Sequence, residues 1–228
     1  MIIVTGASRG IGNYLFRYYR ENQTDSQVYG TCHSAMAEDP NISQINIENS
    51  EQVDEWSKSL LLNKPSELTL INCAGVNNNA MAHKAAVEDW QSVINVNLLG
   101  TYNVIRSFLP YMREVGHGRI VNFSSVVAEK GVPGTSAYAA SKSGMWGLSR
   151  AIAAENGAKN ININSINLGY SDIGMGIDEI NEDLKQIITK NIPARRFCQP
   201  EEILDTVEFL RKVAYINGTS ISLSGGLV

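Results

Sequence analysis

Short apolar segments alternate with longer helical patterns along the chain, and this alternation constrains the fold more than any other feature. Most short segments carry Ile and Val at consecutive positions, which is typical of strands buried on both faces. The expected strands are Ile2–Thr5, Val28–Cys32, Ile42–Ile47, Leu68–Asn72, Arg119–Ser124, Ile161–Ile166 and Thr219–Leu223. Helical patterns lie near 10–22, 51–62, 88–113, 137–156 and 200–213. The order predicts an α/β fold: one doubly wound domain over residues 1–228, with helices on both faces of a parallel sheet.

Composition and charge exclude several classes of protein. Hydrophobic residues make up 43% of the chain and charged residues 18%, which indicates a soluble globular protein. The net charge of −4 argues against nucleic acid or an anionic membrane as the main partner. No apolar stretch approaches the roughly 18 residues of a membrane span, and the start of the sequence lacks the basic region of a signal peptide. Cys32, Cys73 and Cys198 lack metal-type spacing, so we expect reduced thiols, no metal site and a cytoplasmic location.

The segment from Gly169 to Ile192 departs from the alternating pattern. It carries several glycines, then a weakly amphipathic helix, and ends before Pro193. An insertion beside the carboxyl edge of a sheet often covers a ligand. We therefore expect a substrate lid at about 169–192, with a plain surface excursion as the alternative.

The first expected strand runs directly into a glycine-rich loop, Thr5–Gly12, and a helix follows. Backbone amides and a helix N-terminus suit a pyrophosphate, and glycine permits the tight turn and the close approach of phosphate. Between a strand and a helix, this motif predicts dinucleotide binding rather than a plain structural turn. The residues expected to contact the cofactor here are Gly6, Ser8, Arg9, Gly10, Ile11 and Gly12.

The end of the second expected strand indicates which dinucleotide binds. A site that prefers NAD places an acidic residue about 20 residues beyond the glycine loop. No acidic residue follows this strand before Glu38, whereas Arg9 can pair with a 2′-phosphate. His33 and Ser34 can add hydrogen bonds, so the sequence favours NADP over NAD.

Markers along nearly the entire chain resemble the short-chain dehydrogenase/reductase family, and most closely its 3-oxoacyl-carrier-protein reductase type. They are Thr5–Gly12, Asn72-Cys73-Ala74-Gly75, Asn95–Gly100, Ser124-Ser125-Val126, Tyr138–Lys142, Ile192-Pro193, Pro200–Glu202 and Ser224-Gly225-Gly226. The resemblance implies a seven-stranded Rossmann sheet, a nicotinamide cofactor and reversible carbonyl–alcohol chemistry. It also implies that helices 88–113 and 137–156 pair across subunits in a homodimer or homotetramer.

Tyr138 and Lys142 lie four residues apart on an expected helix, so they share one face. Tyrosine has a pKa near 10, and we expect the Lys142 ammonium, with the nicotinamide ring, to lower it so that Tyr138 can act as general acid/base. By resemblance, Ser125 hydrogen-bonds the substrate oxygen, with Ser124 as its competitor. Asn97 resembles the residue that holds a water linked to the lysine, although a structural role is open.

Further cofactor contacts follow from the resemblance: Asn46, Ile47, Asn72, Ala74, Gly75, Tyr138, Lys142 and Gly169. After the sixth strand, the chain lacks the family's proline and threonine, and Ser171 is a candidate replacement for the nicotinamide contact. Ser224 stands where the family usually has aspartate.

The sequence constrains the identity of the substrate less than it constrains the type of reaction. Reductases of carrier-protein thioesters resemble one another in a cluster of basic residues before the fifth strand. This chain has Glu114-Val115-Gly116 there instead, and of the expected basic positions only Lys159 is still basic. This disfavours an acyl carrier protein and favours a free small-molecule carbonyl or alcohol. The alternatives to an NADP-dependent oxidoreductase are a non-catalytic dinucleotide-binding regulatory or scaffold protein and an epimerase or dehydratase of the same fold.

Overall fold

Seven parallel strands form one sheet in the order β3-β2-β1-β4-β5-β6-β7, which confirms the predicted Rossmann architecture. In this computed structural model, the described residues are 1–22, 27–33, 39–175 and 181–228. The strands are β1 (Ile2–Thr5), β2 (Val28–Cys32), β3 (Ile42–Gln44), β4 (Thr69–Asn72), β5 (Gly118–Ser125), β6 (Ile161–Leu168) and β7 (Ser220–Leu223). Their carboxyl ends meet at one edge of the sheet, and the predicted site residues lie along this edge.

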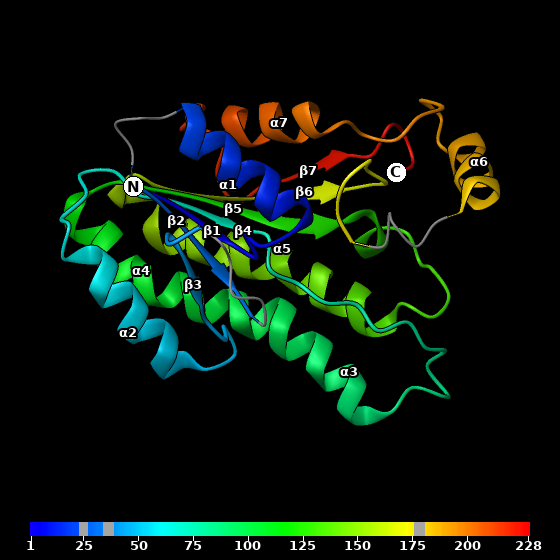
Figure 1. Ribbon diagram of the computed structural model, residues 1–228, viewed down its shortest axis with the longest axis horizontal. Helices are drawn as coiled ribbons and strands as arrows, with labels where there is room; N and C mark the ends of the chain where they lie inside the picture. The colour runs from blue at the N-terminus through cyan, green and yellow to red at the C-terminus, as the bar shows by residue number, and fades with distance from the viewer. Residues whose placement is uncertain (23–26, 34–38, 176–180) are drawn as a thin grey trace.

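The helices form a layer on each face of the sheet (Figure 1). On one face lie α1 (Gly10–Asn22) and α7 (Pro200–Lys212), and on the other lie α2 (Ser50–Leu61), α4 (Thr101–Val115) and α5 (Ser136–Asn156). The shorter elements are α3 (Val87–Ile94), the π-helical turn η1 (Asn95–Gly100), the 3₁₀ turns η2 (Val126–Ala128) and η3 (Gly157–Lys159), and α6 (Glu182–Asn191). Helix α6 lies beyond the carboxyl ends of the strands, apart from both layers (Figure 1).

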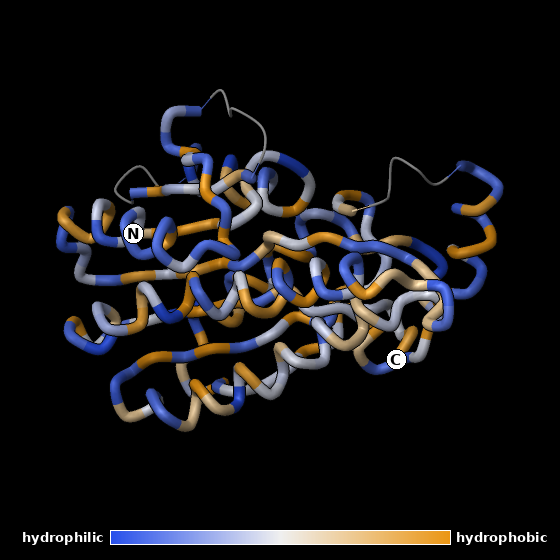
Figure 2. The backbone as a smooth tube through the Cα atoms, turned by 90° about the horizontal axis from the view of Figure 1, so that it is seen from below, coloured by the Kyte–Doolittle hydropathy of each residue, from blue (hydrophilic) through white to orange (hydrophobic). Residues whose placement is uncertain are grey.

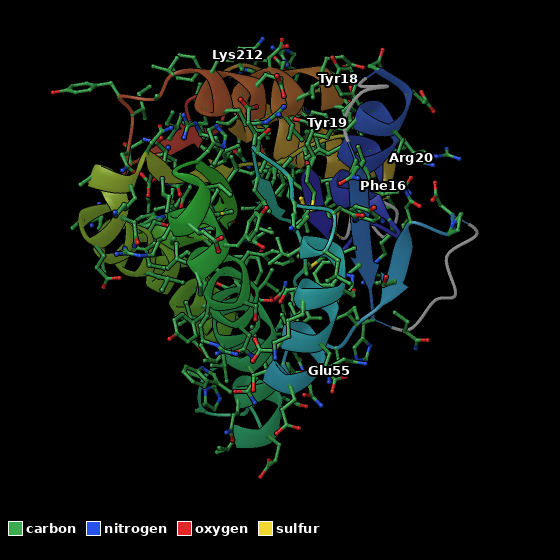
Figure 3. The ribbon with its side chains drawn as sticks, turned by 90° about the vertical axis from the view of Figure 1, so that its left-hand side faces the viewer. Phe16, Tyr18, Tyr19, Arg20, Glu55 and Lys212 are labelled. Carbon is green, nitrogen blue, oxygen red and sulfur yellow. The ribbon has the colours of Figure 1, made fainter. Side chains whose placement is uncertain are left out.

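Two apolar cores, one on each face, lie between the sheet and its helix layers. Apolar side chains of β1, β4, β5 and β6 alternate between the two faces, so these central strands contribute to both cores. Figure 2 shows the apolar stretches concentrated in the strands, whereas the helices alternate between apolar and polar segments. On α1, Phe16 and Tyr19 are fully buried, and Tyr19 donates to Glu208 of α7, which ties the two helices together (Figure 3). Among the described residues, no helix is long and apolar enough to cross a bilayer.

The third strand and the long helix after β4 differ most from the sequence prediction, while the bounds of the other predicted elements agree to within one or two residues. The third strand ends at Gln44 rather than Ile47, because Asn46 turns the chain by accepting from the backbone N–H of Glu48 and of Asn49. The single helix predicted over 88–113 contains the wider turn η1, and such turns are frequent at functional sites. The weak helix expected between Gly169 and Ile192 is present as α6.

Candidate active site

At two glycines of the glycine-rich loop, the surroundings leave no room for a side chain. Gly6 has a φ of 68°, and a Cβ there would lie 2.9 Å from the Ala74 backbone. A Cβ on Gly12 would lie 2.2 Å from the Gly6 carbonyl oxygen. The loop therefore presents bare backbone before the N-terminus of α1, as an anion site requires. This cradle fits the pyrophosphate of a dinucleotide.

The end of β2 is hydrogen-bonded to the same loop. Thr31 accepts from the Ala7 N–H through its carbonyl (2.7 Å) and from the Gly6 N–H through Oγ1 (3.4 Å). Arg9 on the loop and His33 after β2 are both exposed at this corner, where the sequence places a 2′-phosphate. Ser34 lies outside the described residues.

Ser125, Tyr138 and Lys142 converge at the carboxyl end of β5. Ser125 is the last residue of the strand, and its side chain lies near enough to the Tyr138 hydroxyl to lower the pKa of that group. The Lys142 Nζ lies 5.5 Å from the centre of the Tyr138 ring and donates to the Phe123 carbonyl at 2.7 Å. Ser124, the competitor, instead donates to the Lys142 carbonyl at 2.9 Å. The geometry thus brings together the three residues of the predicted set and gives Ser124 a structural bond.

The protonation of this set differs from the sequence-based expectation. Burial raises the pKa of Tyr138 to about 12, and the Ser125 side chain opposes this only in part. Burial also lowers the pKa of Lys142 to about 8. The expected lowering of the Tyr138 pKa is therefore wrong for the protein alone, because a desolvated site disfavours both the phenolate and the ammonium.

Asn97 lies in η1, is fully buried and anchors the segment after β4. Its Oδ1 accepts from the Val76 N–H at 2.8 Å, while its Nδ2 donates to the Val76 carbonyl and to Ser141 Oγ. Ser141 in turn donates to the Tyr138 carbonyl at 2.8 Å. A Cβ on Gly75 would lie 3.2 Å from Asn97 Oδ1 and 3.8 Å from Lys142 Nζ. The segment after β4 therefore lies between the glycine loop and the lysine, and the side chain of Asn97 supports it.

The remaining predicted cofactor residues lie at different depths around this edge. Ala74 meets Gly6 directly, and its N–H donates to Thr5 Oγ1 at 3.1 Å. Asn72 is buried in the sheet, where its side chain donates to Asn122 at 2.8 Å. Asn46 turns the chain after β3, and Ile47 is buried against Gly100. Of these residues, Ala74 meets a glycine of the loop, and Asn72 is in register with Thr5 at the start of the loop.

The chain after β6 passes over the glycine loop. Gly169 follows Leu168 at the end of the strand, and a Cβ on Gly10 would lie 3.0 Å from the Cα of Gly174. Ser171 Oγ donates to the Ile173 carbonyl at 2.5 Å, so its hydroxyl is engaged within this turn.

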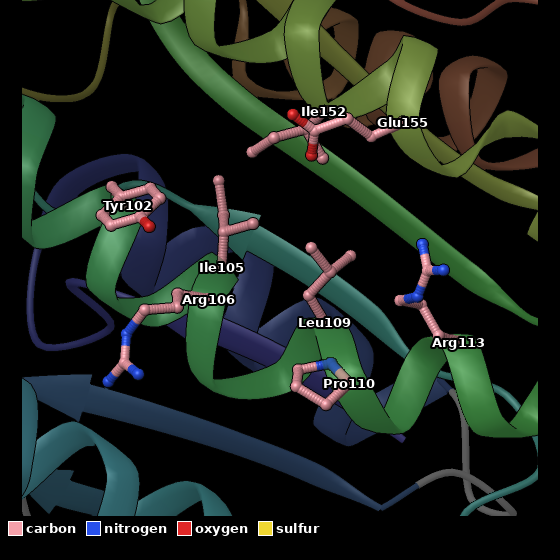
Figure 4. A pocket seen from close by; sticks show the side chains of 8 residues that line it. All are labelled: Tyr102, Ile105, Arg106, Leu109, Pro110, Arg113, Ile152 and Glu155. Atoms are coloured by element: carbon pink, nitrogen blue, oxygen red, sulfur yellow. The ribbon is translucent and has the colours of Figure 1, made fainter.

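A separate groove of about 500 Å³ lies between α4 and α5, away from the glycine loop. Its apolar lining comes mainly from Tyr102, Ile105, Leu109, Pro110 and Ile152 (Figure 4). Arg106, Arg113 and Glu155 add charges to the lining.

Several contributors to this edge were not singled out from the sequence. Thr31 and Ser141 resemble ordinary strand and helix residues, so nothing in the sequence distinguished them. Asn167 follows the end of the strand expected at Ile161–Ile166, so from the sequence it resembled a loop residue.

Comparison with known proteins provides independent evidence. The sequence profile of the short chain dehydrogenase family matches residues 1–184. The chain is 32% identical over 238 residues to a 3-oxoacyl-[acyl-carrier-protein] reductase of Chlamydia trachomatis, covering 99% of this chain and 96% of that protein. It is 38% identical over 160 residues to an acetoacetyl-CoA reductase of Allochromatium vinosum, covering 69% of this chain and 65% of that protein. A crystal structure of a candidate gluconate dehydrogenase from Agrobacterium tumefaciens superposes with a TM-score of 0.87 at 24% identity, covering 100% of this chain and 95% of that chain, and shows the shared fold.

Proposed function

The chain belongs to the short-chain dehydrogenase family of oxidoreductases, and on this premise we propose that it is an NADPH-dependent reductase that interconverts a carbonyl and a secondary alcohol. The observation that carries the proposal is the convergence of Ser125, Tyr138 and Lys142 beside the glycine loop. A non-catalytic binding protein would need the loop but not this set.

Each residue of the set has a role that its surroundings support. Tyr138 has a raised pKa and keeps its proton at neutral pH, as a proton donor for carbonyl reduction must. Ser125 lies beside that hydroxyl, where it would orient the substrate oxygen toward it. The Lys142 ammonium stabilises negative charge on the phenol oxygen as the proton leaves. Its hydrogen bond to Phe123 fixes the amine close to the tyrosine ring.

The cofactor would be held by the glycine loop at its pyrophosphate and by Lys142 at its nicotinamide ribose. Arg9, with His33, would pair with the 2′-phosphate and select NADPH. When bound, the nicotinamide supplies the hydride, while the protein supplies the proton and the orientation. The Ser171 hydroxyl is engaged by the Ile173 carbonyl, so it must turn if it contacts the nicotinamide.

The relatives and the surface before β5 together favour a 3-oxoacyl group on a small thioester. The Chlamydia and Allochromatium relatives are described as reductases of 3-oxoacyl-carrier and acetoacetyl-CoA thioesters, respectively. The arginines near β5 are bound internally: Arg113 donates to Asn156, and Arg119 donates to the Asn160 carbonyl. With fewer free cations to attract an acidic carrier protein, a small-molecule thioester is the better candidate, and the similarity to the Allochromatium relative makes acetoacetyl-CoA the first substrate to test.

The groove between α4 and α5 supports the proposed pairing of subunits. Apolar residues in its lining would pack against the same helices of a second copy, and the two arginines and Glu155 would complement that copy's charges. This arrangement gives a homodimer or, with a second interface, a homotetramer.

Replacing Tyr138 by Phe tests the chemistry. The variant keeps the ring but loses the proton, so turnover of NADPH with acetoacetyl-CoA should fall by roughly 10²–10⁴-fold. Affinity for NADPH should change little, because the glycine loop, Arg9 and Lys142 remain. Cofactor oxidation and cofactor binding are measured separately, with NADH and other carbonyl compounds in parallel. A Tyr138→Phe protein with near wild-type turnover would refute the mechanism.

A further inference from the structure

A row of three polar residues crosses the sheet one position before the ends of β5, β6 and β7. Ser124 is in register with Asn167, and Asn167 is in register with Ser222. All three lie on the face covered by α5, because their neighbours Phe123, Ile166 and Leu223 belong to the opposite core.

The row binds two successive turns of the catalytic helix. Ser124 donates to the Lys142 carbonyl at 2.9 Å. One turn later, Trp146 Nε1 donates to Asn167 Oδ1 at 2.8 Å. Lys142 and Trp146 are four residues apart and share a face with Tyr138, so these bonds fix the rotation of α5 against the strand ends.

The same row is held from outside by Glu129, on the turn that follows Ser125. Its Oε1 accepts from Asn167 Nδ2 at 2.6 Å and from Ser222 Oγ at 2.7 Å. Asn167 is only 2% exposed. Its amide nitrogen donates to Glu129, and its amide oxygen accepts from Trp146. We call Glu129, Asn167, Trp146 and Ser222 the Glu129 network.

The turn that carries Glu129 is short, and the Lys130 N–H closes it by donating to the Val126 carbonyl at 2.8 Å. The Val127 N–H donates to Ser125 Oγ at 3.4 Å, and the Glu129 N–H donates to the Val126 carbonyl at 3.0 Å. Ser143 of α5 donates to the Ala128 carbonyl at 3.3 Å. The two shorter bonds to the Glu129 side chain therefore fasten this turn to β6 and β7. Within the turn, one bond to the Ser125 side chain and one backbone bond to the Val126 carbonyl connect Ser125 with Glu129.

We propose that Glu129 is a positioning residue: through Asn167 it fixes the Ser125 turn and the Tyr138 helix to the same strand ends. The inference rests on the proposed function, because Glu129 would set the distance between Ser125 and the Tyr138 hydroxyl. The substrate oxygen would receive the tyrosine proton between these two groups. A misplacement of about 1 Å at such a site costs roughly 100-fold in rate.

The test compares Glu129→Ala with Glu129→Gln, using NADPH and the carbonyl compound that the wild-type protein reduces fastest. Alanine removes both bonds, and kcat should fall about 10- to 100-fold, with the Kd for NADPH within about twofold of wild type. Glutamine keeps an oxygen that accepts both bonds, so kcat should return to within about threefold. Lys130→Ala, the next residue on the same turn, is the matched control and should keep wild-type kcat.

A second readout does not depend on turnover. The fluorescence of Trp146, isolated by subtracting the spectrum of Trp146→Phe, should shift in Glu129→Ala but not in Glu129→Gln. If Glu129→Ala does not fold, Ser222→Ala removes one of the two bonds and should give a smaller loss, about threefold in kcat.

Wild-type kcat in Glu129→Ala would overturn the inference, and so would equal losses in the Ala and Gln variants, which would indicate a role for charge. Tyr138→Phe in parallel separates this result from the proposed function. If the wild-type protein reduces no carbonyl compound, the proposed function fails, and the Trp146 spectrum alone decides whether Glu129 orders the network.

Discussion

Tyr138 and Lys142 form a pair of titratable groups that burial drives toward their neutral forms. The pKa of the phenol rises to about 12, and that of the amine falls to about 8. At neutral pH the phenol keeps its proton, and the amine is still charged. This is the combination that a proton donor with an electrostatic partner needs, and it is available before any ligand contributes.

The Lys142 pKa predicts a pH limit for carbonyl reduction. Below about pH 8 the ammonium is present, and above it the charge that stabilises the developing phenolate is lost. The value of kcat/KM, which reports ionisations of the free protein, should therefore fall as the pH rises above about 8. In Lys142→Arg the charge persists, so this fall should disappear even if the rate is lower. A wild-type profile that stays flat to pH 10 would contradict the assignment.

Arg9 is the residue proposed to distinguish NADPH from NADH, because its guanidinium would pair with the 2′-phosphate. Arg9→Ala should weaken NADPH binding by about 1.5–3 kcal/mol, or roughly 10- to 150-fold, and leave NADH binding nearly unchanged. Arg17, exposed two turns further along α1, is the matched control. Dissociation constants for both cofactors check this prediction, and equal losses for both would show that Arg9 does not meet the phosphate.

At the scale of elements, α5, the helix that carries Tyr138 and Lys142, is attached to the sheet partly by hydrogen bonds. Besides the row at the strand ends, Asn122 Nδ2 donates to Ser149 Oγ at 3.1 Å, and the Ser149 and Ser165 hydroxyls are hydrogen-bonded to each other. Apolar packing tolerates sliding of a helix, whereas directional bonds set its register. The helix that carries Tyr138 and Lys142 is therefore fixed in rotation as well as in position.

Helix α6 is attached far less firmly than α7. No residue of α6 is buried, and Leu184 and Ile187 are exposed, whereas α7 buries Ile203 and Val207. Lys185 forms an ion pair with Asp172 at 3.4 Å, and such exposed pairs contribute little stability.

Amide hydrogen exchange should follow this difference. In the protein alone, α6 (Glu182–Asn191) should exchange faster than α7 (Pro200–Lys212), which serves as the internal control. If the segment acts as a lid, α6 should gain protection with NADPH and a substrate analogue, while α7 changes little. Equal protection of both helices in the protein alone would show that α6 is a permanent part of the packed fold.

The sequence predicted the regular elements well, because each was marked by its own periodicity. It missed features that depend on contacts between distant segments. The end of β3 was misplaced because the Asn46 turn outweighs the β propensity of Ile45 and Ile47. The direction of the Tyr138 pKa shift was missed because desolvation depends on the tertiary environment, and spacing along a helix does not reveal it.

At the scale of the whole molecule, the proposed active site and the proposed subunit contact lie on different parts of the surface. The glycine loop and Ser125 lie at the carboxyl edge of the sheet, whereas the groove lies between α4 and α5. The two are not independent, because α5 carries Tyr138 near its N-terminus and Ile152 in the groove lining. A contact that immobilises the outer side of α5 would also support the N-terminal end of that helix, which carries Tyr138.

Tyr102 offers the most direct test of that contact. It is 42% exposed on α4 and lines the groove, so Tyr102→Glu adds a charge there with little loss of core packing. In a dimer formed through the groove, this charge would be desolvated opposite apolar residues, and the variant should sediment as a monomer. Leu62→Glu, at a site 82% exposed beyond the end of α2, should keep the wild-type assembly. The unfolding midpoint of the wild-type protein should rise with concentration, and that of Tyr102→Glu should not. If Tyr102→Glu sediments like the wild-type protein, the subunits do not meet at this groove.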